Sequence, residues 1–201
     1  MSHPNIEATY GLSPAQEGML FHSVLETDGG FYVTQLVCEV RRADADQLVR
    51  AWQEVVDRHA IFRTAFAWKG VQKPLQVVGR KVTLPVVRED WRNRTMETRG
   101  AALDACLQQD RRRGFDLSRA PAMRLALLQA GEMEWTLVWS HHHVLLDGWS
   151  LPRVVREVGE IYAALAAGKE AALPAPRPYG DYIAWLARQD REVRGTLERQ
   201  S

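Results

Sequence analysis

Three consecutive histidines, His141, His142 and His143, end an apolar stretch and are followed by an Asp-Gly pair, Asp147 and Gly148. An imidazole with an ordinary pKa of about 6.5 can accept and return a proton near neutral pH. If the apolar stretch is a strand that continues through His143, then His141 and His143 share one face and His142 points the other way. The pattern therefore predicts different roles for neighbouring histidines and favours a single general base.

Two other histidine chemistries fit the sequence poorly. Contiguous histidines on a strand do not converge on one metal ion, as a pair at i and i+4 of a helix would, and Cys38 and Cys106 are not placed to complete a zinc site. A Ser-His-Asp hydrolase is disfavoured because the chain has no Gly-x-Ser-x-Gly elbow. We expect no metal, and we expect both cysteines to be buried, reduced thiols.

The elements around the histidines alternate between helical and extended patterns. Ser13, Pro14 and Gln16 combine an N-cap hydroxyl, a first-turn proline and a capping glutamine, which predicts a helix start. Apolar periodicity predicts helices over residues 14–25, 45–59, 95–113, 151–165 and 179–194, and strands over 31–40, 61–68, 74–79, 84–88, 122–129 and 135–141. The last two strands form a hairpin. The fold class that follows is an α/β (α+β) sandwich with a mixed, mostly antiparallel sheet flanked by helices.

Composition excludes several function classes. The chain has 201 residues and a formal net charge of +1, without the basic excess that binding to a nucleic-acid backbone requires. Its apolar runs are far shorter than the roughly 20 residues that cross a bilayer, and its polar start does not resemble a signal peptide. We therefore expect a cytoplasmic protein with no nucleic-acid or membrane partner.

Five segments together carry a family resemblance. Residues 142–150 resemble the HHxxxDG motif of non-ribosomal peptide synthetase condensation domains, acyltransferases of secondary metabolite and antibiotic biosynthesis. Residues 12–22 and 58–66 resemble the family's first and second motifs, and residues 114–121 and 179–186 resemble further stretches of such domains. Condensation domains consist of two chloramphenicol acetyltransferase-like lobes and are longer than this chain.

The resemblance implies a domain organisation and a reaction. Residues 1–173 would be the N-terminal lobe, and residues 174–201 a Pro-rich connector and helix leading toward a missing C-terminal lobe. Such domains form a peptide bond between a donor aminoacyl or peptidyl thioester and an acceptor amine. Both substrates are carried on phosphopantetheine arms of carrier proteins. The lobe itself is expected to bind no cofactor, and its partners are the donor and acceptor carrier proteins and the C-terminal lobe.

The resemblance also implies roles for individual residues. His143 matches the catalytic position, as a base or as a group that positions the amine, and His142 beside it is expected to be structural. Gly148 has no side chain, so its backbone N–H can approach the reacting carbonyl. Asp147 is expected to form a structural ion pair with Arg63 of the second motif.

Several alternatives stay open. The fragment is expected to be inactive alone, which leaves a non-catalytic docking or scaffold lobe for carrier proteins as one alternative. A coenzyme A-dependent acyltransferase of the same superfamily is another. Trp135, Trp139 and Trp149 are predicted to lie in the core, and the arginines at 111–113 are predicted to be a solvated helix end.

Overall fold

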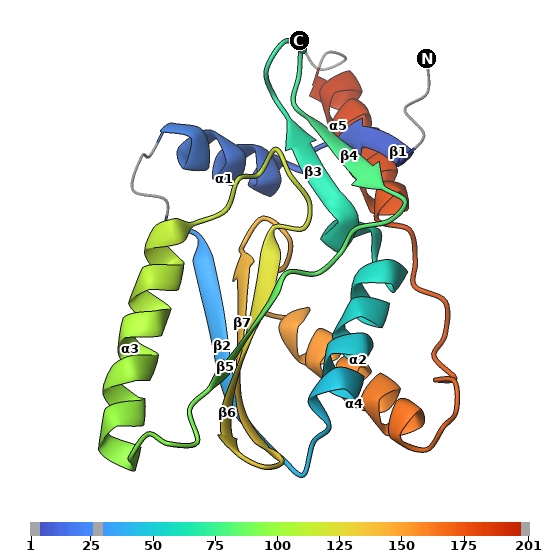
Figure 1. The fold of residues 1–201 in the computed structure, drawn as a ribbon. Coiled ribbons are helices and arrows are strands. Elements are labelled where there is room, and N and C mark those ends of the chain that lie inside the picture. The colour runs from blue at the N-terminus through green and yellow to red at the C-terminus, as the bar shows by residue number, and fades with distance from the viewer. Residues whose placement is uncertain (1–4, 26–29, 198–201) are drawn as a thin grey trace.

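The computed structural model describes residues 5–25 and 30–197, with side chains through residue 189 (Figure 1). The helices are α1 (Pro14–Leu25), α2 (Ala45–Arg58), the short 3-10 helix η1 (Ala60–Arg63), α3 (Met96–Arg113), α4 (Leu151–Ala166) and α5 (Tyr179–Leu197). The strands are β1 (Ile6–Gly11), β2 (Val33–Arg41), β3 (Thr64–Ala67), β4 (Leu75–Gly79), β5 (Val86–Asp90), β6 (Met123–Gly131) and β7 (Glu134–His142).

The main sheet has the strand order β2-β7-β6-β5. β7 pairs antiparallel with β2 and with β6, whereas β5 and β6 are parallel. Figure 1 shows α3 on one face of this sheet and α2 with α4 on the other. The sheet is therefore mixed, mostly antiparallel and flanked by helices, which confirms the predicted fold class.

The core is divided by the main sheet because strand side chains alternate between its faces. Leu137 and Trp139 of β7 belong to the larger cluster, together with Trp52 of α2 and Ile161 of α4. Val138, between them in sequence, packs with the smaller cluster on the α3 side. Both neighbours of β7 are strands, so its C-terminal end is held from two sides.

A second sheet, with order β1-β4-β3, is entirely antiparallel. Its first strand, β1, was not predicted, because the sequence of Ile6–Gly11 lacks a strong apolar alternation and its residues are only half-buried or exposed. Pairing with β4 gives β1 the backbone partners that make it a strand. α5 packs beside β1 (Figure 1). The ring of Tyr10 on β1 lies against Gly180.

Most predicted elements are present, with two local differences. Residues 61–63 were predicted as strand but belong to η1, closed by a hydrogen bond from Phe62 N–H to the His59 carbonyl at 3.0 Å. This turn buries both Ile61 and Phe62, which an extended strand would point to opposite faces. The second difference is at β7, which runs to His142, one residue beyond the predicted strand of residues 135–141 and one residue short of the third histidine.

Two further expectations concern the cysteines and membranes. Cys38 and Cys106 are free thiols, as predicted, but they are half-buried, and desolvation raises the pKa of each.

No helix within residues 5–25 and 30–197 is both long and apolar enough to span a bilayer.

Candidate active site

His143 lies in the turn that follows β7. The turn is closed by a hydrogen bond from Leu145 N–H to the His142 carbonyl at 3.1 Å, which makes His143 and Val144 its central residues. The backbone N–H of His143 donates to the Tyr32 carbonyl at 2.8 Å. The imidazole of His143 is exposed and makes no hydrogen bond to another described residue. It is therefore free to meet a substrate.

His142 is buried beneath this turn. Its Nδ1 accepts a hydrogen bond from Val144 N–H at 3.1 Å, and its Nε2 lies 3.1 Å from the hydroxyl of Ser23 on α1. Desolvation lowers the pKa of His142 to about 4, so the ring is neutral at pH 7. Its contacts place it inside the fold rather than at the surface where a substrate would bind.

His141 is also buried, and its ring centroid lies 4.7 Å from that of Trp139. Desolvation lowers its pKa to about 4, and its Nε2 has no partner among the described residues. His141 and His143 would share a face only if the strand continued through His143, and this condition is not met, because β7 ends at His142 and His143 lies in the exposed turn.

The structure does not bring Asp147 and Arg63 together. Nη1 of Arg63 donates to Oε2 of Glu7 on β1 at 2.6 Å and to the carbonyl of Gly79 on β4. Asp147 instead accepts a hydrogen bond from Ser150 N–H at 2.8 Å, and hydrogen bonds from Ser150 lower its pKa. The expected Arg63–Asp147 ion pair is thus replaced by two separate sets of contacts. Arg63 is held at the small sheet, and Asp147 is held at the start of α4.

Gly148 lies in open space beside Asp147. A Cβ at this position would meet no atom within 4 Å, so the fold of the described residues does not require a glycine here. The next residue, Trp149, is 89% exposed, which makes its predicted core position wrong, whereas Trp139 is fully buried as predicted. The apolar side chain of Trp149 is thus presented to solvent next to the HHxxxDG segment.

Two buried glutamines, Gln16 and Gln76, support the turn, although no pattern in the sequence indicates a role for them at the site. Gln16 caps α1 as predicted, because its Oε1 accepts from Ser13 N–H at 3.0 Å. Its Nε2 lies 3.3 Å from the Val144 carbonyl and 3.2 Å from Oε1 of Gln76. Nε2 of Gln76 donates to the Gly11 carbonyl at 2.8 Å. The capping signature was visible in the sequence, but the second use of Gln16 was not.

A hollow of about 340 Å³ lies beside the turn, lined in part by His143, Asp147, Ser13, Tyr179 and Tyr182. Burial raises the pKa of Tyr179 to about 12, so its hydroxyl stays protonated at neutral pH. The hollow thus combines one exposed imidazole, one carboxylate and two aromatic side chains at the C-terminal end of a central strand.

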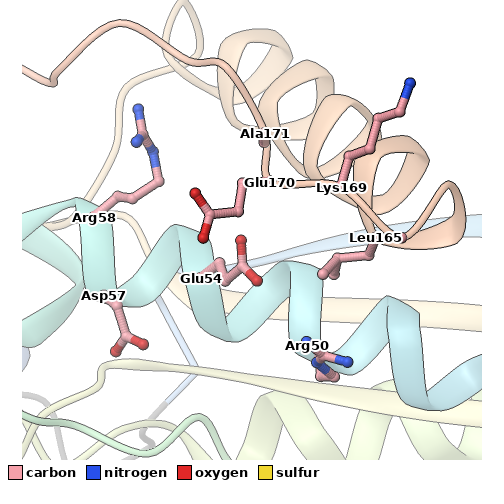
Figure 2. A pocket seen from close by; sticks show the side chains of 9 residues that line it. Arg50, Glu54, Asp57, Arg58, Leu165, Lys169, Glu170 and Ala171 are labelled. Atoms are coloured by element: carbon pink, nitrogen blue, oxygen red, sulfur yellow. The ribbon is translucent and has the colours of Figure 1, made fainter.

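A different cavity, of about 760 Å³, lies between α2 and the segment that follows α4 (Figure 2). Figure 2 shows charged side chains of both signs along it, including Arg50, Glu54 and Glu170. No histidine, cysteine or serine lines it. We therefore place the candidate active site at the turn after β7 and not in this cavity.

Comparison with known proteins identifies the family of the chain. The condensation domain family is matched over residues 6–198, so the chain belongs to this family. It is 51% identical over 187 residues to one of the linear gramicidin synthase proteins of Brevibacillus parabrevis, and 38% identical over 190 residues to bacitracin synthase 1 of Bacillus licheniformis. Each match covers 93% of this chain and 4% of the relative.

Solved structures show the same fold. The starter condensation domain of rhizomide synthetase RzmA superposes with a TM-score of 0.81 at 20% identity, covering 92% of this chain and 44% of that chain. The four-domain non-ribosomal peptide synthetase AB3403 gives a TM-score of 0.75 at 19% identity, covering 95% and 14%. The chain therefore has the chloramphenicol acetyltransferase-like fold of a condensation-domain N-terminal lobe and spans under half of the RzmA domain.

Proposed function

We propose that this chain supplies the catalytic histidine of a peptide-bond-forming condensation domain, an acyltransferase. The observation that carries the proposal is the exposed His143 imidazole on a turn at the end of a central strand, preceded by two histidines that are buried and neutral. Of the three adjacent imidazoles, His143 is the one that a substrate can reach.

Peptide-bond formation requires one proton to be removed from the acceptor amine. The acceptor α-amine attacks the donor thioester carbonyl, the C–N bond forms, the C–S bond breaks, and the proton lost by nitrogen ends on the departing thiolate. A free α-amine has a pKa of about 7.7–8.0, so most of it is protonated at pH 7 and a general base can assist the transfer. His143 accepts that proton or orients the amine that carries it.

The proposal also assigns roles to the backbone of Gly148, to the carrier proteins and to the C-terminal lobe. Gly148 has no side chain and the space that a Cβ would fill is open, so its backbone N–H is the proposed donor to a developing oxyanion. Both substrates arrive on phosphopantetheine arms of donor and acceptor carrier proteins, so the lobe needs no cofactor of its own. The connector and α5 lead toward the C-terminal lobe, and the working protein is cytoplasmic.

The exposure of His143 also supports the expectation that this chain alone does not condense. A reaction between two tethered arms needs an opposite wall that excludes water and orients the second arm. One lobe provides the imidazole but leaves it in solvent. The second lobe is the proposed source of that wall.

The test uses loaded donor and acceptor carrier proteins. In the protein that contains both lobes, His143→Ala should lower the rate of dipeptide formation at least about 10²-fold, the contribution of a positioned base or acid. His22→Ala, which alters another exposed histidine, is the matched control and should leave the rate unchanged. Undiminished product formation by His143→Ala would refute the proposal.

The same assay separates the alternatives. The chain of residues 1–201 should form no dipeptide unless the second lobe is added. Carrier-protein binding by both lobes together without any turnover would indicate a docking or scaffold module. Acyl transfer from coenzyme A thioesters at least as fast as from loaded carriers would indicate the coenzyme A-dependent alternative.

A further inference from the structure

Ser23 lies on α1, and its side chain reaches the histidine that precedes His143. We propose that Ser23 is a positioning residue whose hydroxyl holds the His142 imidazole in the orientation that fixes the turn carrying His143. The inference rests on the proposed function for its effect on turnover. The arrangement of the hydrogen bonds can be tested without any reaction.

The direction of every hydrogen bond in this chain of contacts can be assigned. The backbone N–H of Val144 is a donor only, so Nδ1 of His142, 3.1 Å away, must be unprotonated. The single proton of the neutral ring is therefore on Nε2. The Ser23 hydroxyl donates its own proton to the Met19 carbonyl at 2.7 Å, which leaves its oxygen to accept from Nε2 at 3.1 Å.

This arrangement connects the ring orientation to the shape of the turn. The His142 carbonyl and the His142 ring both bond to the turn: the carbonyl accepts from Leu145 N–H, and Nδ1 accepts from Val144 N–H. In sequence, His143 lies between His142 and the two residues, Val144 and Leu145, whose N–H groups bond to His142. The Tyr32 ring packs beside the His142 imidazole at a centroid distance of 5.7 Å and limits the rotation of that imidazole. A displaced ring would therefore alter the backbone on which His143 stands.

The Ser23 hydroxyl does more than form a local hydrogen bond within α1. A serine hydroxyl bonded to the carbonyl four residues earlier is a common local feature of helices. The Ser23 oxygen, however, also meets a buried ring whose Nε2 proton has no other acceptor among the described residues. Without the hydroxyl this proton is left unpaired inside the protein, which favours another position of the ring.

The spectroscopic test uses the chain of residues 1–201 uniformly labelled with ¹⁵N. The wild-type protein should show His142 protonated on Nε2 only, and its Val144 amide should exchange slowly with solvent. Ser23→Ala should broaden or shift the Nε2–H signal and speed exchange of the Val144 amide. Ser23→Thr, which keeps the hydroxyl, and His22→Ala, an exposed neighbour on α1, should retain the wild-type signals. Protonation on Nδ1, or a Ser23→Ala spectrum identical to wild type, would overturn the proposal.

The kinetic test uses the protein that contains both lobes, at a temperature where all variants are folded. Ser23→Ala should lower kcat about tenfold, with KM for each loaded carrier protein unchanged, because the imidazole is misplaced while the carrier surfaces are intact. Ser23→Thr should restore kcat. A spectral change without loss of kcat would overturn the positioning role. If His143→Ala itself leaves turnover intact, the proposed function fails, while the spectra still decide the hydrogen-bond arrangement.

Discussion

Nε2 of Gln16 lies 3.3 Å from the carbonyl oxygen of Val144, the residue that follows His143. Gln16 belongs to the first turn of α1, is 2% exposed and also bonds to Gln76. The first motif of the chain therefore supports the backbone of the HHxxxDG segment directly.

Replacing Gln16 should weaken the fold through this contact. Gln16→Ala removes the side-chain donor to the Val144 carbonyl and to Oε1 of Gln76, which should lower the free energy of unfolding by about 1–3 kcal/mol. Urea denaturation measures the change. Glu17→Ala, an exposed neighbour on α1, is the control and should change stability by less than about 0.5 kcal/mol. Equal stability of the two variants would contradict the proposed support.

The partners of Arg63 can be identified by double-mutant cycles. Arg63→Ala combined with Glu7→Ala should show a coupling energy of about 1 kcal/mol, because the carboxylate bonded to Arg63 is itself partly exposed. Arg63→Ala combined with Asp147→Ala should be additive within about 0.5 kcal/mol. The reverse result would restore the Arg63–Asp147 pair that the motif resemblance implies.

Asp147 should have an effect of its own at the start of α4. Asp147→Ala removes the side-chain acceptor for the N–H of Ser150, the N-cap residue of α4, and should cost about 1 kcal/mol, the usual net contribution of one hydrogen bond. Asp147→Asn, which keeps a side-chain oxygen, should lose less. Thermal unfolding of both variants measures the difference, and equal losses would show that the charge matters more than the hydrogen bond.

The two buried histidines predict a dependence of stability on pH. Their pKa values fall from 6.5 to about 4 on folding, so the unfolded chain binds more protons between these values. Stability should therefore be fully present above about pH 6.5 and decline toward pH 4, by at most about 3 kcal/mol for each histidine. Denaturation at about pH 4.5, 5.5, 6.5 and 7.5 measures this slope. His141→Leu should flatten it, and His22→Ala should not.

The Gly148→Ala variant tests whether the glycine is required by the fold or by the reaction. Its surroundings are open, so Gly148→Ala should leave the melting temperature within about 2 °C of the wild-type value. If the backbone N–H contacts the reacting carbonyl, the added methyl group should lower the rate of dipeptide formation in the protein with both lobes. A large loss of stability would show instead that the glycine serves the fold.

The sequence alone predicted the elements that depend on neighbouring residues. The capping pattern at Ser13 and Gln16, the hairpin of β6 and β7, and the HHxxxDG segment are all visible within short windows. They are predictable because helix caps and strand alternation arise from local backbone geometry. β1 was missed for the same reason, since it becomes a strand through pairing with β4.

The tertiary structure decided which distant groups meet. Gln16 and Val144 are 128 residues apart in sequence, Ser23 and His142 are 119 apart, and Glu7 and Arg63 are 56 apart. No periodicity in the sequence specifies these pairs, because each depends on how separate elements pack. The end of β7 at His142 is likewise set by its hydrogen bonds to neighbouring segments, and it places His143 in solvent while its two neighbours are buried.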